Sequence, residues 1–376
     1  MSEAYCGGLV FANQHLNGLP AASALAGLPA FGVIEAGRRI LGRARRGWPT
    51  PPLSKPRRPR SHGLLHRRAD RNQARQRRDR APSATAELIA QSAVFLSRDP
   101  RLGPVLPDGA ADLSRRFLAV GAPRKLMLIR QLSRPGLRVV VRAVERAVLP
   151  GIQLHYAVRK RFIEDAVRGF LAGGGTQVVV LGAGLDTLAS RLARRFPHVD
   201  FIEIDHPATQ RRKRRAIDAT PARNLRLHAA DLGRTTVEVA LGCVATFRPG
   251  TPTFFVLEGV TMYLSGATVA TTLQSCADAG GAGTRIGWTF MEPDARGRIA
   301  FRRSRRGLVG AWLTTTGEPF TWGIAPARVP AFLEPLGLRT MQIVDADELR
   351  ARYLTPSGIN DALAEGEDIC VCEVPT

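Results

Sequence analysis

The sequence predicts an α/β fold: a Rossmann-like, doubly wound and mostly parallel sheet of seven strands, with a helical N-terminal cap and a disordered basic N-terminal extension. From residue 154 onward, apolar strands alternate with helices, a pattern typical of parallel sheets covered on both faces. The first strand runs directly into Gly-Ala-Gly at 182–184. Residues 38–80 are rich in arginine and proline, so they bury too little surface to offset the entropy of ordering.

The predicted boundaries follow from these patterns. Residues 1–82 form the extension, and residues 83–376 form one domain: a helical cap at 83–150 starting at Ser83 or Thr85, a core at 151–291, a lid insert at 292–325 and a completion of the sheet at 326–376. Helices after the cap are expected at 154–172, 186–196, 207–217, 235–241, 266–279 and 326–336. Strands are expected at 177–182, 199–204, 225–229, 252–258, 284–290, 339–346 and 367–374.

The net charge of +22 raises the question of nucleic acid. Fifty of the 54 basic residues are arginine, and residues 1–82 alone carry +12, so composition and a solvated tail explain the excess better than a phosphate-binding surface. Nucleic-acid binding is therefore disfavoured. The alternative that remains is a non-catalytic nucleotide-fold protein whose basic tail binds nucleic acid, and deletion of residues 1–80 would separate the two.

The five cysteines lack the spacing of a disulfide framework or of a metal site with histidine. A reducing, cytoplasmic location and the absence of a metal are therefore expected. The sequence contains no run of about 18 apolar residues, so no membrane span is expected.

The glycine loop indicates which nucleotide is bound. Gly182 and Gly184 match the first two glycines of a dinucleotide-binding loop, but Thr187 stands in place of the third. Asp186 lies at the start of the next helix, where it would repel a diphosphate and complement the helix dipole. The loop therefore favours a ligand without phosphate that carries positive charge, and S-adenosylmethionine fits.

Three acids follow the next three strands, at the edge where ligands bind in open α/β sheets. Asp205 would hold ribose hydroxyls, or cap the helix that begins at Pro207. Asp231, with the backbone of Leu232, would meet adenine, or form an Asx turn. Glu258 would accept from the cofactor's ammonium, or cap the next turn.

A further candidate lies on the helix before the first strand. Arg159 precedes Ile163 by four residues, on the apolar stripe, whereas Lys160 points away from that stripe. An inward arginine near the sheet edge needs an anion: either the cofactor's carboxylate or an internal salt bridge.

The motifs "RKRFIED", "VVVLGAGLDTLASRL", "FIEIDHPATQRRKR", "AADL" and "FFVLEGVTMYL" together resemble the leucine carboxyl methyltransferase-like class I methyltransferases, especially their actinobacterial branch. The resemblance covers about residues 83–376. It implies the class I methyltransferase fold, S-adenosylmethionine as cofactor, and the cofactor-binding set Arg159, Gly182, Gly184, Asp205, Asp231, Leu232 and Glu258. Two departures, Lys160 and Leu188, are expected to lie outside the binding pattern.

The expected reaction is methyl transfer to a carboxylate or hydroxyl oxygen of a small-molecule or lipid-like acceptor. A carboxylate acceptor needs no general base, whereas a hydroxyl acceptor does. Candidates for that base are Tyr263, Glu292 and His155, and none is assigned. The lid insert is expected to wall the acceptor pocket with Trp312, Phe320 and Trp322.

Overall fold

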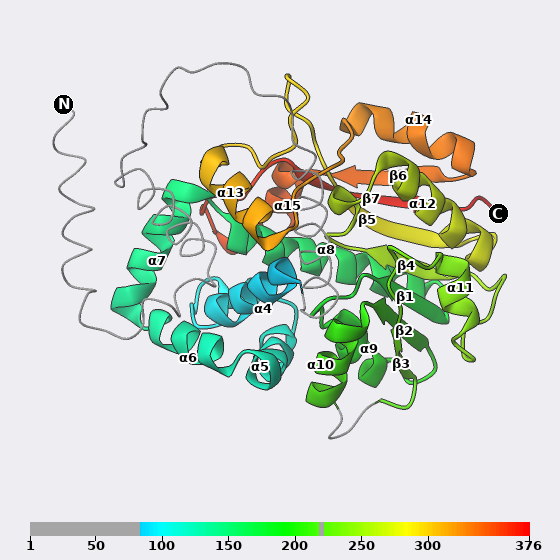
Figure 1. Ribbon diagram of the computed structural model, residues 1–376, viewed down its shortest axis with the longest axis horizontal. Helices are drawn as coiled ribbons and strands as arrows, with labels where there is room; N and C mark the ends of the chain where they lie inside the picture. The colour runs from blue at the N-terminus through cyan, green and yellow to red at the C-terminus, as the bar shows by residue number, and fades with distance from the viewer. Residues whose placement is uncertain (1–82, 218–221) are drawn as a thin grey trace, which may run out of the picture.

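The protein is described by a computed structural model that covers residues 83–217 and 222–376. A single seven-stranded sheet runs through it in the order β3-β2-β1-β4-β5-β7-β6 (Figure 1). All neighbours pair in parallel except β7, which runs antiparallel to both β5 and β6. The order reverses between β1 and β4, which is where open α/β sheets bind their ligands.

The predicted fold class is confirmed, and each predicted strand exists to within two residues at either end. Hydrophobic runs without alternation explain why the four central strands are buried on both faces. The strands are β1 (Gln177–Leu181), β2 (Asp200–Asp205), β3 (Leu225–Ala229), β4 (Phe254–Leu257), β5 (Arg285–Met291), β6 (Arg339–Val344) and β7 (Glu367–Glu373).

Helices cover both faces of the sheet. One apolar cluster joins one face to α8 (Ile152–Ala172), α9 (Leu188–Arg195) and α15 (Ala346–Tyr353). A second cluster joins the other face to α11 (Val237–Gly242), α12 (Gly266–Gly280) and α14 (Val329–Leu333). The remaining core helix, α10 (Pro207–Ile217), contacts β2 and β3 at the edge of the sheet.

Four helices lie beside the carboxyl edge of the sheet, on the left in Figure 1. They are α4 (Ala84–Leu96), α5 (Ala110–Gly121), α6 (Pro123–Leu132) and α7 (Pro135–Val148). Ser83 is the N-cap of α4, since its hydroxyl accepts from the N–H of Ala86 at 3.1 Å. Pro135 takes the first helical position of α7.

The structure differs from the sequence prediction in three places. The single helix expected at 326–336 is three short pieces, because Pro330 and Pro335 cannot donate backbone hydrogen bonds. Two helices were not predicted: α13 (Arg306–Thr316), and α15, which begins where the strand expected at 339–346 gives way to an N-cap at Asp345. The disorder expected for residues 1–82 lies outside the described residues.

A buried ion pair supports β2, the strand that ends at Asp205. Lys213 on α10 and Glu203 in β2 are both fully buried, with Nζ and Oε2 2.5 Å apart. Burial raises the pKa of Glu203 to about 7, although Lys213 lowers it. The ammonium also lies 5.5 Å from the ring centre of Phe117 on α5. This pair therefore ties the cap to the sheet, at the cost of desolvating two charges.

We expect Lys213→Met to lower the free energy of unfolding by about 3–5 kcal/mol, because it leaves Glu203 buried without its partner. Lys213→Met combined with Glu203→Met should recover most of that loss. Urea denaturation followed by circular dichroism measures both. Arg248→Met, which breaks a half-exposed pair with Asp200, is the control and should change less than about 1 kcal/mol. Equal stability of the single variant and the wild type would contradict this role.

Candidate active site

The predicted cofactor residues meet at one edge of the sheet. Four loops leave this edge, after β1, β2, β3 and β4. Because β7 runs antiparallel, its first residue lies at the same edge: Glu367 pairs with Met291, the last residue of β5. The edge therefore combines the ends of four parallel strands with the beginning of the last strand.

The glycine loop leaves no room for side chains. Gly182 and Gly184 adopt positive φ angles of 65° and 49°, which favour glycine. A Cβ on Gly182 would lie 2.6 Å from a methyl carbon of Val260, and one on Gly184 would lie 3.1 Å from the Cβ of Ala86 on α4. The helix after the loop starts at Leu188, whose N–H is bonded to Asp186. Because this N–H is bonded to a carboxylate, the loop suits a ligand that lies close to it and carries no phosphate.

Asp205 is tied to the glycine loop. Its carboxylate accepts hydrogen bonds from the N–H groups of Gly184 and His206. The N–H of Ala208, in the first turn of α10, is bonded instead to Nδ1 of His206 at 3.3 Å, so Asp205 is not the cap of that helix. Burial raises the pKa of Asp205, against the lowering effect of these N–H bonds and of Lys213.

The loop after β3 adopts the local turn that its sequence allows. Oδ1 of Asp231 accepts from the N–H of Gly233 at 2.9 Å, which is an Asx turn. Leu232 packs against the apolar cluster on the α11–α12 face. The adenine role of these two residues stays a prediction.

Arg159 connects α8 to two strands. Its Nη1 lies 2.7 Å from both carboxylate oxygens of Glu367, and its Nε and Nη2 lie 3.0 Å and 2.8 Å from Oε1 of Glu258. All three side chains are less than a tenth exposed. Of the two alternatives left open for Arg159, an internal salt bridge is therefore present. The guanidinium also lies beside Gly259, 3.7 Å from the position of a Cβ there.

Glu367 was not predicted, because it begins a strand that was interpreted only as closing the sheet. It also accepts from Nε2 of the fully buried His155, at 2.9 Å. Burial would raise the pKa of Glu367, but Arg159 and then His155 outweigh it and lower the pKa to about 2. The acid at the first position of this strand is the only signal in the sequence, and it indicates the site only once the strand is known to be antiparallel.

The position of Lys160 differs from the prediction, which had it pointing away from the apolar stripe and outside the binding pattern. Its ammonium pairs with Asp186 and lies 3.0 Å from Oε1 of Glu258. Burial would raise the pKa of Asp186, but Lys160 and Lys213 lower it below its usual value. The long lysine side chain crosses from the edge of the apolar stripe to these carboxylates, a reach that helical periodicity does not capture.

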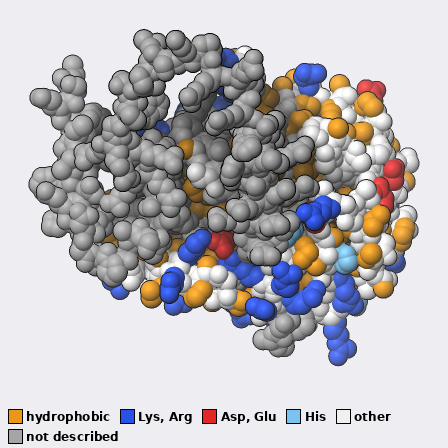
Figure 2. Space-filling view, in the orientation of Figure 1, with side chains coloured by type: hydrophobic (Ala, Val, Ile, Leu, Met, Phe, Trp, Pro, Cys, Tyr) orange, Lys and Arg blue, Asp and Glu red, His pale blue; other side chains and the backbone are white. Residues whose placement is uncertain are grey.

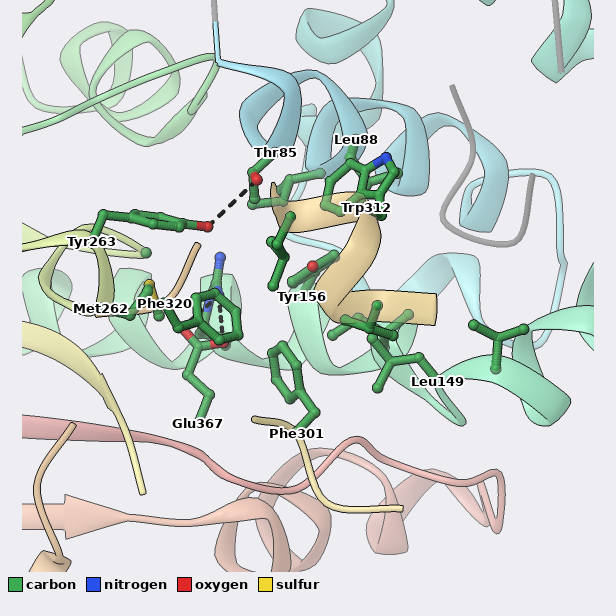
Figure 3. A pocket seen from close by; sticks show the side chains of 17 residues that line it. Thr85, Leu88, Leu149, Tyr156, Met262, Tyr263, Phe301, Trp312, Phe320 and Glu367 are labelled. Carbon is green, nitrogen blue, oxygen red and sulfur yellow. Dashed lines mark hydrogen bonds and ion pairs between the residues drawn. The ribbon is translucent and has the colours of Figure 1, made fainter. Parts of the chain in front are cut away.

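A largely apolar cavity of about 50 Å³ opens beside this cluster (Figure 3). Arg159, Glu367 and Gly259 are among its lining residues. Tyr263 projects toward Thr85 of α4, and Trp312 of α13 lies beside Leu88. The remaining lining residues are Ile89, Val148, Leu149, Ile152, Tyr156, Met262, Phe301, Val309, Leu313 and Phe320.

The structure separates the residues that were considered for the acceptor site. Trp312 and Phe320 line the cavity, whereas Trp322 packs on Trp288 and Phe332 in the core of the sheet, so its predicted place in the pocket wall is wrong. Among the three candidate bases, Tyr263 lines the cavity, His155 lies behind Glu367, and Glu292 pairs with Arg302 outside it. Glu318, which bonds to the start of α4, was not predicted.

Exposed arginines gather on another part of the surface, along the lower edge in Figure 2. They belong to α9, α10 and the region of β3, and include Arg194, Arg195, Arg211, Arg214, Arg215, Arg223 and Arg226. Nucleic-acid binding stays an untested alternative. Within residues 83–217 and 222–376, no helix is long and apolar enough to cross a membrane, and no group of three potential metal ligands occurs.

We expect Glu367→Gln to lower the free energy of unfolding at pH 7 by about 3 kcal/mol, because Arg159 loses one of its two buried partners. Since the folded-state pKa of Glu367 is lowered from 4.5 to about 2, its contribution is present above pH 4.5 and is lost as the pH falls toward 2. In urea titrations, the difference in free energy of unfolding between wild type and variant should therefore become smaller as the pH falls from 4.5 toward 2. Glu373→Gln, at the far end of β7, is the control. A gap that does not change with pH would contradict this assignment.

The chain is similar in sequence to known proteins. The family described as leucine carboxyl methyltransferase matches residues 118–277. A protein of Mycobacterium sp. (strain JLS), provisionally named an S-adenosyl-L-methionine-dependent methyltransferase, is 32% identical over 225 residues, which cover 59% of this chain and 70% of that protein. A protein of Frankia alni with the same description is 31% identical over 184 residues, 46% of this chain and 60% of its own length. The chain thus spans less than two thirds of some of its relatives.

Among solved structures, a DUF574 family protein from Streptomyces avermitilis superposes with a TM-score of 0.47 and 14% identity, covering 71% of this chain and 98% of that one. A methyltransferase-like protein from Thermobifida fusca gives a TM-score of 0.46 and 17% identity, covering 70% of this chain and 94% of that one. The family match and the identity to the mycobacterial protein rest on sequence alone. By that match, the chain belongs to the leucine carboxyl methyltransferase family of S-adenosylmethionine-dependent methyltransferases.

Proposed function

We propose that this protein transfers a methyl group to an oxygen atom of a small, largely apolar acceptor. The observation that carries the proposal is that an apolar cavity includes Arg159, Glu367 and Gly259 in its wall, where the loop after β4 begins. S-adenosylmethionine, when bound, supplies a methyl group activated by a sulfonium. The chain's part is to align the two reactants and to exclude water.

The residues proposed to hold the cofactor are those at the carboxyl edge. Gly182 and Gly184 allow close approach to the loop, Asp205 accepts from the ribose hydroxyls, and Asp231 with Leu232 flanks adenine. Glu258 receives the ammonium. Arg159 receives the carboxylate, and Lys160, 3.0 Å from Glu258, adds a second cation beside it. The charges of these side chains support the set, because the cations Arg159 and Lys160 lie directly beside carboxylates.

The acceptor is proposed to enter between α4, α7 and α13. Aliphatic and aromatic side chains form most of the lining, which favours an apolar body over a sugar or a peptide. The cavity volume of about 50 Å³ is below the roughly 150 Å³ of an engineered cavity that binds benzene. The cap helices must therefore move apart before an organic acceptor binds.

We expect Asp205→Ala to weaken binding of S-adenosylhomocysteine about 30- to 1000-fold, because two charge-assisted hydrogen bonds to ribose are worth roughly 2–4 kcal/mol. Asp205→Asn should fall between this variant and the wild type. Isothermal titration calorimetry measures all three without turnover. Asp200→Asn, at the opposite end of β2, is the control. Equal dissociation constants across the series would remove Asp205 from the site.

The proposed function is tested with methyl-labelled S-adenosylmethionine and a cell extract, followed by identification of the labelled product. We expect Trp312→Ala to raise the acceptor KM about 10- to 100-fold, since a buried aromatic wall contributes about 1.5–3 kcal/mol. Its affinity for S-adenosylhomocysteine should not change. Val239→Ala, on the exposed surface of α11, is the control. Loss of cofactor affinity with an unchanged acceptor KM would contradict the pocket assignment.

A further inference from the structure

The polar groups of the acceptor cavity do not suit a carboxylate. Its one cationic lining residue, among the residues that the structure describes, is Arg159. That guanidinium already contacts both oxygens of Glu367 and one of Glu258, and its remaining capacity is the one proposed above for the cofactor's carboxylate. An acceptor carboxylate would therefore enter an apolar cavity next to Glu367 without a free cation, which is costly. A neutral acceptor group avoids this cost.

A chain of hydroxyl groups leads from the cavity to a carboxylate. The Oη of Tyr263 donates to Oγ1 of Thr85 at 3.4 Å (Figure 3). The Oγ1 of Thr85 in turn donates to Oε2 of Glu318 at 2.5 Å. The three residues come from the turn after β4, from α4 and from the segment after α13. Glu318 is half-buried, so this chain connects the cavity to the surface.

Other groups at the cavity are poor proton acceptors. Glu367 already accepts from Arg159 and His155, and its pKa is lowered to about 2. Burial raises the pKa of Tyr263, so the phenol is neutral and keeps a lone pair for an incoming donor. An acceptor hydroxyl beside Tyr263 can therefore donate to a group that is already linked to a base.

We infer that the acceptor's reacting group is a hydroxyl, and that Tyr263 takes its proton and passes it through Thr85 to Glu318. The inference rests on the proposed O-methyl transfer. The acceptor O–H bond breaks as the bond between its oxygen and the methyl carbon forms. Tyr263 and Thr85 each receive one proton and give one on, and the carboxylate of Glu318 ends protonated. The positive charge of the sulfonium and the negative charge of Glu318 disappear together, so charge balances. Tyr263 is the catalytic residue, and Thr85 and Glu318 act through it.

A purely structural role must be distinguished, because Glu318 also accepts from the N–H groups of Ala84 and Thr85 at 3.2 Å and 3.0 Å. These bonds fasten the segment after α13 to the start of α4. Glu318→Gln keeps one oxygen, which can still accept the two bonds from Thr85, but it loses the acceptor of the Ala84 N–H and removes the base. Thr85→Val keeps the backbone N–H and the shape but removes the hydroxyl, whereas Thr85→Ser restores it.

The first measurement asks what kind of product forms. Labelled product from the extract reaction is treated with mild alkali, which releases methanol from methyl esters and leaves methyl ethers intact. Alkali-stable label on oxygen is the expected result. A methyl ester would overturn the hydroxyl inference while leaving O-methyl transfer standing. Absence of any transfer to oxygen would overturn the proposed function as well.

The second measurement uses the variants on the extract acceptor and on a series of para-substituted phenols that ends with 4-nitrophenol. At a pH where the less acidic phenols are protonated, Tyr263→Phe, Thr85→Val and Glu318→Gln should each lower kcat about 100-fold. Thr85→Ser should retain most activity. The defect should vanish for ionised 4-nitrophenol, which has no proton to give. Tyr353→Phe, which removes a hydroxyl bonded to Asp165 on the surface, is the control.

Binding and stability provide readouts that do not depend on turnover. The dissociation constant of S-adenosylhomocysteine and the thermal midpoint of the three variants should stay close to those of the wild type. If they change, and if activity falls equally for protonated and ionised phenols, the three residues only hold α4 in place and the relay is overturned. Full activity of Tyr263→Phe on a protonated phenol would overturn it as well.

Discussion

The active-site edge depends on one buried guanidinium. Arg159 joins α8 to the end of β4 and to the start of β7, through Glu258 and Glu367. A charge so fully buried is tolerated only with close counter-charges, and two carboxylates provide them. The guanidinium connects α8 to the sheet, lines the apolar cavity and belongs to the proposed cofactor set. If that proposal holds, the two sites share a single electrostatic support.

Much of the fold could be predicted because it is local. Apolar runs identify the strands, and residues that directly follow parallel strands, such as Gly182, Asp205 and Glu258, must share one edge. Glu367 could not be predicted this way, because it starts a strand whose direction the pattern does not reveal. The contacts of Lys160 could not be predicted for a different reason. Helical periodicity places its Cα but not the end of its long side chain.

Contacts between distant segments set the rest of the site. The bonds between Thr85 and Glu318 join residues 233 positions apart, and no periodicity connects a helix start to a loop so far away. The same limit explains Trp322, whose side chain packs on Trp288 and Phe332 instead of lining the cavity. Sequence patterns thus located the cofactor edge better than the acceptor cavity.

The antiparallel direction of β7 has a consequence for how the protein folds. Glu367 is 208 residues from Arg159, and β7 inserts between β5 and β6 rather than adding to an edge of the sheet. Contacts between residues so far apart in sequence form late, because the entropy of closing the loop is lost before the contacts contribute any stability. A folding intermediate that contains β1 to β5 would hold Arg159 against Glu258 alone, without Glu367. The charge balance of the catalytic edge is then completed only when the last strand docks, so its insertion is also the step that makes the enzyme competent.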